Sequence, residues 1–336
     1  MPQGILCCAT NLMANNLYYF LTNEYNPYKN IALEEYLLLN APENSIMLYL
    51  WQNERTVVIG RNQCAWRECN VEALQKDNGT LARRLSGGGA VYHDLGNLNF
   101  TFLYPKAKEN IKRQMNVIVD ALESLGMNVL LTGRNDISYR GRKMSGNAFY
   151  TNGSRAYHHG TIMLDVDLDT MLKYLNVNKE KYISKGIESV RSRVINVKSV
   201  MPSINIDKLQ SALIKSFEKV YKGKAEEFSE HSIDKESLLL RAKEFSDWNW
   251  VYGRPINFNF EKEKRFLWGL VRIEAEIASG RIINIGIFTD ALEPNLFVSL
   301  ENKLLGVRFE TKDIKDIIYS EPSLEKYSED IIELFV

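Results

Sequence analysis

Three consecutive glycines follow two arginines in the stretch Arg83–Asp94, which reads RRLSGGGAVYHD. Glycine has the largest backbone entropy cost of any residue and contributes no packing, so a strand gains nothing from three of them. Bare backbone is useful where a ligand approaches the chain, and successive glycine N–H groups can surround an anion. Two arginines add positive charge that suits phosphate or carboxylate. The stretch is a candidate anion-binding loop, and the alternative is a glycine turn beside two solvated arginines.

A second basic cluster, Arg140-Gly141-Arg142-Lys143, begins a run that alternates in polarity toward Phe149. The run turns at Asn152-Gly153, and the returning segment carries His158 and His159. Such a hairpin would hold Lys143 on rigid backbone. Neighbouring strand residues face opposite sides, so one histidine could contact a ligand, and a metal pair is not expected at this spacing. The alternative for the cluster is a solvated basic turn.

The polar segment 184–196 reads SKGIESVRSRVIN and carries its own apolar residues. It is long for a plain connection, and long loops in compact domains commonly serve as active-site lids. We interpret it as a candidate lid.

These three stretches resemble motifs of the lipoate-protein ligase family. The first resembles the family's RRxxGGGxVxHD signature, and the Asp94-Leu95-Gly96-Asn97 that follows also fits the family pattern. The second resembles its RKxSGxA motif, whose lysine falls on Lys143, and the third resembles its KGIxSVRSRVxN segment. The resemblance extends from about Tyr18 to the C-terminus, and a signature of this length is far more specific than a lone glycine-rich loop.

The resemblance implies a ligase that activates lipoate with ATP to lipoyl-adenylate and pyrophosphate, then transfers the lipoyl group to a lysine of an acceptor domain. The implied acceptors are lipoyl domains of 2-oxoacid dehydrogenase E2 subunits and the glycine-cleavage H protein, and Mg²⁺ is the implied counter-ion of ATP. Lys143 would bridge the lipoyl carboxylate and the α-phosphate and stabilise charge that develops on both. The segment 184–196 would be the loop that orders over the adenylate.

Strand alternation and the resemblance together define the candidate site. Alternation from Thr80 to Leu85 puts Arg84 and Ser86 on the ligand side and Arg83 on the other face, in a structural role or at the pocket edge. The nucleotide would be held by Arg84, Gly89, Ala90, Val91, Tyr92 and Lys143. Further binding candidates are Arg83, Ser86, Gly88, His93, Asn97, Asn135, Asp136, His159, Gly186, Arg191 and Arg193, and Asp136 is also a candidate metal ligand.

Hydrophobic periodicity predicts the elements that must position these residues. Asn26-Pro27 is a helix start signal for a helix through Leu39, and Ser45–Trp51 and Thr56–Ile59 are predicted to form a hairpin. Further strands are expected at Leu17–Thr22, Thr80–Leu85, Ala90–Tyr92 and Asn97–Leu103. Further helices are expected at Val71–Lys76, Asn110–Leu125, Asp167–Leu175, Ile206–Tyr221 and Lys235–Phe245.

The pattern changes near Asn249–Pro255, where we place a domain boundary. Beyond it, a hairpin of Leu267–Ile277 and Arg281–Phe288 precedes helices near Pro294–Leu305, Lys312–Tyr319 and Glu329–Phe335. The predicted fold class is α+β, with mixed sheets packed against helices. It comprises a flexible extension over 1–16, a large lipoate/biotin-ligase-like catalytic domain over 17–252 and a small accessory domain over 253–336.

The composition argues against other classes of protein. In 336 residues, 42 basic side chains balance 42 acidic ones, which removes a global electrostatic argument for nucleic acid or membrane as partner. No signal peptide or membrane span is recognisable, so a cytoplasmic protein is expected, and we expect a monomer. The four cysteines show neither a disulfide framework nor zinc spacing, so we expect reduced thiols.

Two rival functions remain open. An ATP-independent octanoyl or lipoyl transferase on the same fold would use a cysteine nucleophile, and no cysteine lies downstream of Cys69. A non-catalytic acyl-nucleotide sensor would keep the pocket but would not need Lys143. A biotin-protein ligase is disfavoured because RRLSGGG replaces its GRGRxGR-type loop, and a P-loop phosphotransferase because no GxxxxGK[ST] follows any strand.

Overall fold

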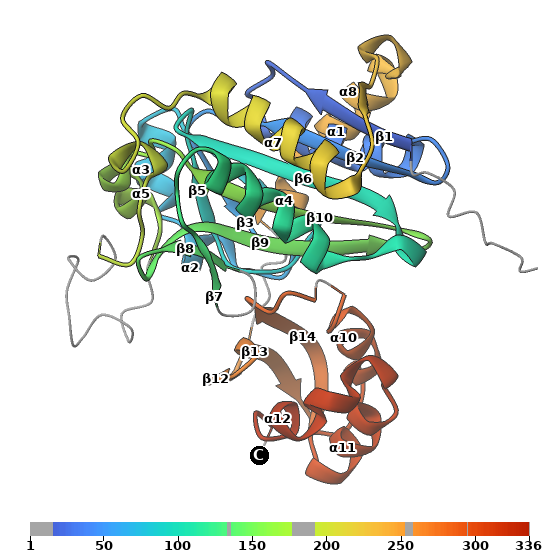
Figure 1. The fold of residues 1–336 in the computed structure, drawn as a ribbon. Coiled ribbons are helices and arrows are strands. Elements are labelled where there is room, and N and C mark those ends of the chain that lie inside the picture. The colour runs from blue at the N-terminus through green and yellow to red at the C-terminus, as the bar shows by residue number, and fades with distance from the viewer. Residues whose placement is uncertain (1–15, 133–135, 177–191, 253–257, 294, 336) are drawn as a thin grey trace, which may run out of the picture.

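The structure is a computed structural model, which describes residues 16–132, 136–176, 192–252, 258–293 and 295–335. A large α+β domain lies beside a small C-terminal domain (Figure 1). Within the described residues, the large domain contains an eight-stranded sheet in the order β11-β1-β2-β6-β10-β9-β8-β7 and a separate three-stranded sheet in the order β4-β3-β5. This arrangement agrees with the predicted fold class.

The strands of the large sheet are β1 (Asn16–Leu21), β2 (Ser45–Trp51), β6 (Asn97–Pro105), β7 (Leu130–Thr132), β8 (Asp136–Tyr139), β9 (Arg142–Asn152), β10 (Arg155–Met163) and β11 (Ala225–Glu227). The second sheet contains β3 (Thr56–Ile59), β4 (Thr80–Arg83) and β5 (Val91–His93). The helices of this domain are α1 (Pro27–Asn40), α2 (Ala65–Glu68), α3 (Val71–Lys76), α4 (Ile111–Ser124), α5 (Leu168–Tyr174), α7 (Ile206–Tyr221), α8 (Lys235–Phe245) and α9 (Trp248–Tyr252).

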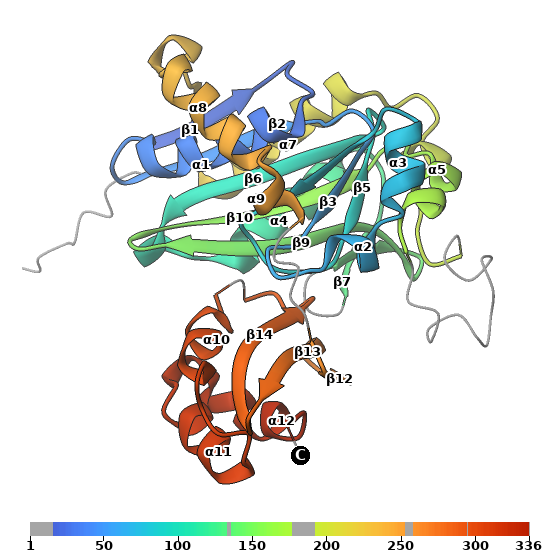
Figure 2. The ribbon, with the colours of Figure 1, turned by 180° about the vertical axis from the view of Figure 1, so that it is seen from behind.

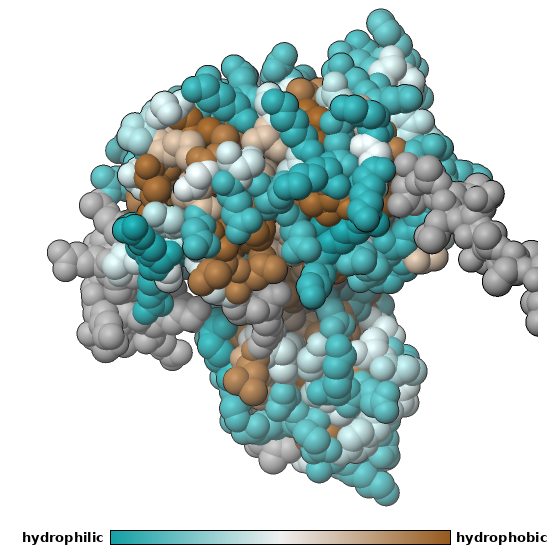
Figure 3. Space-filling view, viewed as in Figure 1, coloured by the Kyte–Doolittle hydropathy of each residue, from teal (hydrophilic) through white to brown (hydrophobic). Residues whose placement is uncertain are grey.

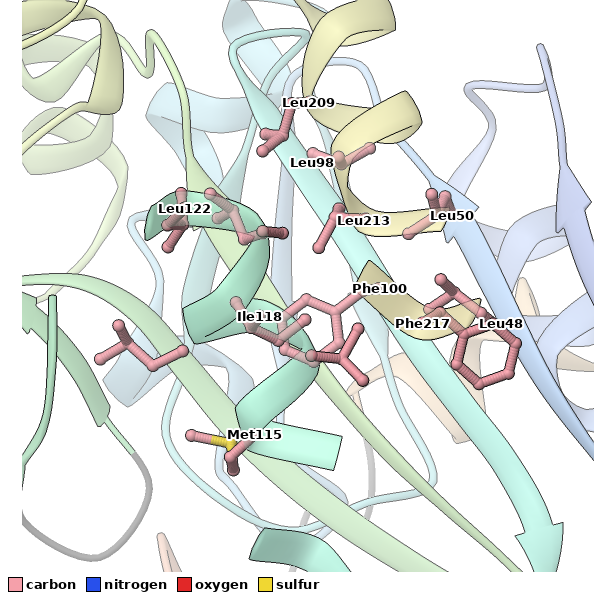
Figure 4. Close-up of a cluster of buried hydrophobic side chains, with 14 of the residues drawn as sticks. Leu48, Leu50, Leu98, Phe100, Met115, Ile118, Leu122, Leu209, Leu213 and Phe217 are labelled. Carbon is pink, nitrogen blue, oxygen red and sulfur yellow. The ribbon is translucent and has the colours of Figure 1, made fainter. Parts of the chain in front are cut away.

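Helices cover both faces of the large sheet. The pair α4 and α7 covers one face (Figure 1), and α1 covers the other, with α8 beside it (Figure 2). Both faces of β2 are buried, which explains why its sequence is apolar from Ile46 to Trp51. Ile46, Leu48 and Leu50 belong to the core under α4 and α7, whereas Met47, Tyr49 and Trp51 belong to the core under α1. Figure 4 shows the first core, in which Leu48 and Phe100 of the sheet meet Phe217 of α7.

The predicted hairpin of β2 and β3 is wrong. The strand β2 pairs with β1 and β6 in the large sheet, whereas β3 pairs with β4 and β5 in the small one. Every residue of both strands is buried, so each strand needs a neighbour on both edges, and pairing with each other would satisfy only one edge. The connection over Gln52–Arg55 therefore carries the chain from one sheet to the other.

Most helix predictions are confirmed. The side chain of Asn26 caps α1 by accepting the N–H groups of Tyr28 and Lys29, and Asn110 caps α4 by accepting that of Arg113. The bounds of α3, α7 and α8 are those predicted. The hairpin of β9 and β10 is also confirmed, with Gly153 at a φ of 57° in its turn.

The C-terminal domain contains a three-stranded antiparallel sheet and helices. Its strands are β12 (Phe260–Phe266), β13 (Gly269–Ala278) and β14 (Arg281–Thr289), and its helices are α10 (Val298–Leu304), α11 (Thr311–Tyr319) and α12 (Ser328–Ile332). The predicted hairpin is β13 and β14. Periodicity missed β12 because this edge strand is mostly exposed and charged.

The surface on the α4 and α7 side is largely hydrophilic, with apolar patches between the helices and next to the C-terminal domain (Figure 3). The edge strand β7 exposes Leu130 and Leu131. No helix in the described part of the chain is long and apolar enough to cross a membrane.

We predict that Phe217→Ala lowers the free energy of unfolding by about 3–5 kcal/mol, because its wholly buried ring packs against Phe102 and Tyr221. Urea denaturation measures the change. Leu239→Ala, on the exposed side of α8, is the control and should change the free energy by less than about 0.5 kcal/mol. Equal losses in the two variants would contradict this description of the core.

Candidate active site

A cavity of about 400 Å³ collects side chains and backbone from both domains. Its walls come from α1, both sheets of the large domain, the glycine loop Ser86–Ala90, and the turn between β12 and β13 of the C-terminal domain. Among the predicted site residues, the cavity is lined by Arg84, Gly88, Gly89, Ala90, Val91, His93, Asp136, Lys143 and His159. The two motifs that are far apart in the sequence therefore meet at one site.

A different physical reason favours glycine at each of the three positions of the loop. A Cβ on Gly87 would lie 2.3 Å from the carbonyl oxygen of Ala291, so only glycine allows this contact with the C-terminal domain. Gly88 has a φ of 90°, and its N–H donates to the same oxygen at 2.8 Å. A Cβ on Gly89 would meet nothing within 4 Å, and this residue lines the cavity. The loop is thus bare where it contacts other backbone and where it lines the cavity.

Arg84 is buried beneath this loop. Its guanidinium donates to the carbonyl oxygens of Gly87, Gly89 and Val58, at 2.7, 2.8 and 3.1 Å. Its Nε also donates to Ser86 Oγ at 3.0 Å. Burial lowers the pKa of Arg84 to about 10, so the group remains positive at neutral pH. Arg84 therefore shapes the glycine loop and contributes positive charge to the cavity wall.

Arg83 points away from the cavity, as strand alternation requires. It donates to the carbonyl oxygens of Gly60, Gln63 and Val251, among others, and so ties α9 to the turn after β3. Both arginines are only 6% exposed, so the alternative of two solvated arginines is wrong.

Lys143 stands at the beginning of β9 and points into the cavity. Its Nζ lies 2.8 Å from Asp136 Oδ1, on the adjacent strand β8. A Cβ on Gly146 would lie 2.8 Å from this Nζ, so the glycine three residues later keeps room for the ammonium group. Arg140 and Arg142 are exposed and do not line the cavity, so the solvated basic turn describes them and not Lys143.

His93 and Asn99 present buried donors to the cavity. The amide of Asn53 lies 3.1 Å from His93 Nδ1 and donates to it, which leaves the proton on Nε2. Burial, assisted by the charge of Arg84, lowers the pKa of His93 to about 3, so the ring is neutral. Neither His93 Nε2 nor Asn99 Nδ2 has a hydrogen-bond partner in the described residues. Both groups are suited to the oxygen atoms of a ligand.

The two adjacent histidines face opposite sides of β10, as predicted. His158 lies between aromatic rings and bonds to Gln114 and Asn147, and burial lowers its pKa to about 3. His159 lines the cavity, with Nδ1 at 2.8 Å from Glu34 Oε1 and Nε2 at 2.7 Å from Ser86 Oγ.

The remaining predicted residues that the structure describes do not line the cavity. Tyr92 packs against Tyr174 in the core under α5, and Asn97 donates to Asn99 Oδ1 at 3.0 Å. Arg193 is exposed, although its carbonyl oxygen accepts the N–H of Lys143 at 2.7 Å. Ser86 and Arg83 lie behind the lining. Asn135, Gly186, Arg191 and most of the candidate lid 184–196 lie outside the described residues.

Sequence reasoning missed several lining residues. The sequence carried a signal for Glu34, because this acidic residue interrupts the apolar stripe of α1 between Ile31 and Leu38. In the structure its side chain is only 1% exposed. Trp51 looked like an ordinary strand residue. Leu267, Trp268 and their neighbours in the C-terminal domain had no signal, because only the docking of that domain brings them to the cavity.

Comparison with known proteins places this chain in a family. Residues 26–218 match the model described as lipoyl protein ligase A/B catalytic domain, and residues 256–335 match that of the bacterial lipoate protein ligase C-terminus. A lipoate-protein ligase A of Bdellovibrio bacteriovorus is 40% identical over 90% of this chain and 91% of its own length. The chain belongs to the lipoate-protein ligase family. The lipoate-protein ligase A of Blochmanniella pennsylvanica is 39% identical over 91% of this chain and 94% of its own length.

Solved structures agree with this family membership. The P. falciparum protein LipL1, in complex with lipoate, has a TM-score of 0.84 at 29% identity, covering 95% of this chain and 98% of its own. A lipoate-protein ligase A bound with ATP has a TM-score of 0.60 at 25% identity, covering 72% of this chain and 99% of its own. The resemblance of the motifs to this ligase family is therefore confirmed.

We predict that Gly89→Val lowers ligase activity more than about a hundredfold while the melting temperature stays within about 2 °C, because Gly89 lines the cavity and a Cβ there meets no protein atom within 4 Å. Activity is measured as lipoate-dependent pyrophosphate exchange. Gly88→Ala is the comparison: its positive φ should destabilise the fold by about 1–2 kcal/mol. Normal turnover of Gly89→Val would show that the loop is only a turn.

Proposed function

We propose that this chain is an ATP-dependent lipoate-protein ligase, which converts lipoate and ATP to lipoyl-adenylate and pyrophosphate and then acylates a lysine of an acceptor protein. The observation that carries the proposal is the cavity in which Lys143 and the arginine-held glycine loop meet. Related proteins solved with lipoate and with ATP support both substrates. The direct test is lipoate-dependent exchange of labelled pyrophosphate into ATP.

The first step brings two anions together. The lipoate carboxylate attacks the α-phosphorus, the bond to the pyrophosphate breaks, and an acyl-phosphate anhydride forms. The ammonium of Lys143 would lie between the carboxylate and the α-phosphate, offset their repulsion, and stabilise the charge that develops in the transition state. In the second step the acceptor amine attacks the acyl carbon and AMP leaves, and the same ammonium would stabilise the departing phosphate.

The Lys143–Asp136 ion pair suits a lysine that must change partners. Its side chains are 44% and 32% exposed, and such a pair contributes little because water competes with it. We propose that Asp136 holds the ammonium in place until substrate oxygens replace the carboxylate. The role of Asp136 as a metal ligand would then be secondary to this one.

The nucleotide would be bound on the glycine loop and the strand that follows. We propose that Gly89, Ala90 and Val91 present backbone to the phosphates, with the buried charge of Arg84 behind them. The N–H of Gly88 already donates to the carbonyl oxygen of Ala291, so Gly88 would contribute less to phosphate binding. No group of three metal-ligating side chains occurs in the part of the chain that the structure describes. We propose that Mg²⁺ enters with the phosphate oxygens of ATP.

The apolar part of the cavity suits the acyl chain. Ile31, Trp51 and Val58 line it from the large domain, and Leu292 from the C-terminal domain. We propose that the lipoyl tail lies along these side chains, with its carboxylate toward Lys143.

An archaeal bi-partite lipoate protein ligase from Thermoplasma acidophilum has been analysed with its E2 lipoyl domain, and it has a TM-score of 0.63 to this chain at 26% identity, covering 73% of this chain and all of its own. We propose lipoyl domains of E2 subunits and the glycine-cleavage H protein as acceptors. We also propose that the enzyme is a monomer and that its two domains divide near residue 252.

The structure disfavours a cysteine-dependent transferase. Neither Cys64 nor Cys69 lines the cavity, and burial raises the pKa of the Cys69 thiol to about 12, so it is a poor nucleophile. Cys7 and Cys8 lie outside the described residues. An acyl-nucleotide sensor would bind both ligands without pyrophosphate exchange, so the same assay separates it from a ligase.

We predict that Lys143→Ala lowers both lipoate adenylation and aminolysis of supplied lipoyl-adenylate by about a hundredfold or more, because one electrostatic contact in such a site contributes on the order of 3 kcal/mol. Lys143→Arg should rescue poorly, since a planar fork does not replace a compact ammonium. Lys198→Ala, which removes a comparably exposed lysine paired with Asp165, is the control. Near-normal rates of Lys143→Ala in both half-reactions would contradict the mechanism.

We predict that a chain ending at Gly253 loses most lipoate activation but still transfers from synthetic lipoyl-adenylate. It would lack Leu267, Trp268 and Leu292 of the cavity and the carbonyl that holds Gly88, whereas Lys143 would remain. Each half-reaction is measured separately. Full ATP-dependent ligation by the shortened chain would contradict a role of the C-terminal domain in activation.

A further inference from the structure

Ser86, His159 and Glu34 form a chain of buried hydrogen bonds beside the cavity. Ser86 Oγ lies 2.7 Å from His159 Nε2, and His159 Nδ1 lies 2.8 Å from Glu34 Oε1. These residues come from the glycine loop, β10 and α1, so the chain links three distant segments. A serine, a histidine and a carboxylate in this order have the geometry of a nucleophilic triad.

Access to the serine rules out the nucleophilic use. Ser86 is 0% exposed and does not line the cavity, so a substrate acyl group could not reach its Oγ. The same Oγ accepts a hydrogen bond from Arg84 Nε at 3.0 Å, which lowers its nucleophilicity further. The triad geometry therefore needs another explanation.

The hydrogen-bond directions are consistent along the whole chain. The carboxylate of Glu34 can only accept, and it accepts from His159 Nδ1 and from Thr101 Oγ1, the latter at 2.6 Å. With the ring proton on Nδ1, the Nε2 atom is placed to accept from the Ser86 hydroxyl. Ser86 Oγ in turn accepts from Arg84, whose other donors hold Gly87 and Gly89. In this arrangement each link has one donor and one acceptor.

We propose that Glu34, His159 and Ser86 are positioning residues that orient Arg84 and thereby hold the glycine loop in its ligand-binding shape. Three successive glycines have no side chains with which to restrict themselves, and their conformational freedom is the largest of any residue. Contacts with residues outside the three glycines must therefore restrict the loop, and Arg84 makes such contacts through its hydrogen bonds to Gly87 and Gly89. The proposal rests on the proposed function in one respect, that this loop binds ATP.

Ser86→Ala is the sharpest test, because Ser86 lines no ligand space yet is the link between His159 and Arg84. We expect the KM for ATP in pyrophosphate exchange to rise about tenfold, while kcat and the KM for lipoate change less than about threefold. Hydrogen exchange at the amides of residues 87–90 should become faster. Ser216→Ala is the matched control, because it also removes a buried hydroxyl, one that donates to the carbonyl oxygen of Val117 between α7 and α4. Ser216→Ala should change neither the KM for ATP nor the hydrogen exchange of residues 87–90.

Glu34→Gln is the second variant, which keeps the volume and removes the charge, and it should shift the KM for ATP and the loop exchange in the same direction. An unchanged KM for ATP together with unchanged loop exchange, in whichever variant folds, would overturn the proposal. A lipoyl ester on Ser86, found by mass spectrometry after incubation of the wild-type chain with lipoyl-adenylate, would overturn it in favour of a nucleophilic serine. Absence of pyrophosphate exchange in the wild-type chain would instead contradict the proposed function, and hydrogen exchange would still decide the positioning role.

Discussion

The site depends on a close approach of bare backbone. Gly60 and Gly88 meet so closely that a Cβ on Gly60 would lie 2.2 Å from the carbonyl oxygen of Gly88. A Cβ on Gly87 would lie 2.3 Å from the carbonyl oxygen of Ala291. The N–H of Arg61 donates to the carbonyl oxygen of Ser86, and that of Gly88 donates to the carbonyl oxygen of Ala291. The loop thus lies between the small sheet and the C-terminal domain. Side chains larger than hydrogen would separate these layers and open the cavity.

The charged groups around this loop differ in how firmly they are held. Arg83 and Arg84 are buried and bonded to carbonyl oxygens, which accept hydrogen bonds without neutralising the positive charge. Because Arg84 lines the cavity, its charge remains available in the wall for anionic ligands. Lys143 is half-exposed and paired with a single carboxylate that water can replace. A rigid loop that binds and a lysine that can change partners suit a reaction with two steps at one site.

Much of this protein follows from the sequence alone. The Asn26-Pro27 start signal predicted α1, and apolar periodicity predicted α4, α7 and α8, because both signals act within a few residues of one another. Strand alternation separated the directions of Arg83 from Arg84 and of His158 from His159, since the two-residue period of a strand does not depend on its neighbours. The motifs also indicated the ligase family and Lys143, although the contacts of that lysine were not predictable from them.

Only the tertiary structure decided which segments meet. Two buried apolar strands, β2 and β3, looked like a hairpin but belong to different sheets, because strand pairing is chosen by the whole set of available edges and not by closeness in sequence. Glu34 and Ser86 lie on segments far apart in the chain, and they share a hydrogen-bond chain only because α1 packs across β10. The part of the cavity wall that the C-terminal domain supplies likewise exists only because the two domains are in contact. Local signals specify elements and directions, whereas partners at long range are determined by packing that no single stretch contains.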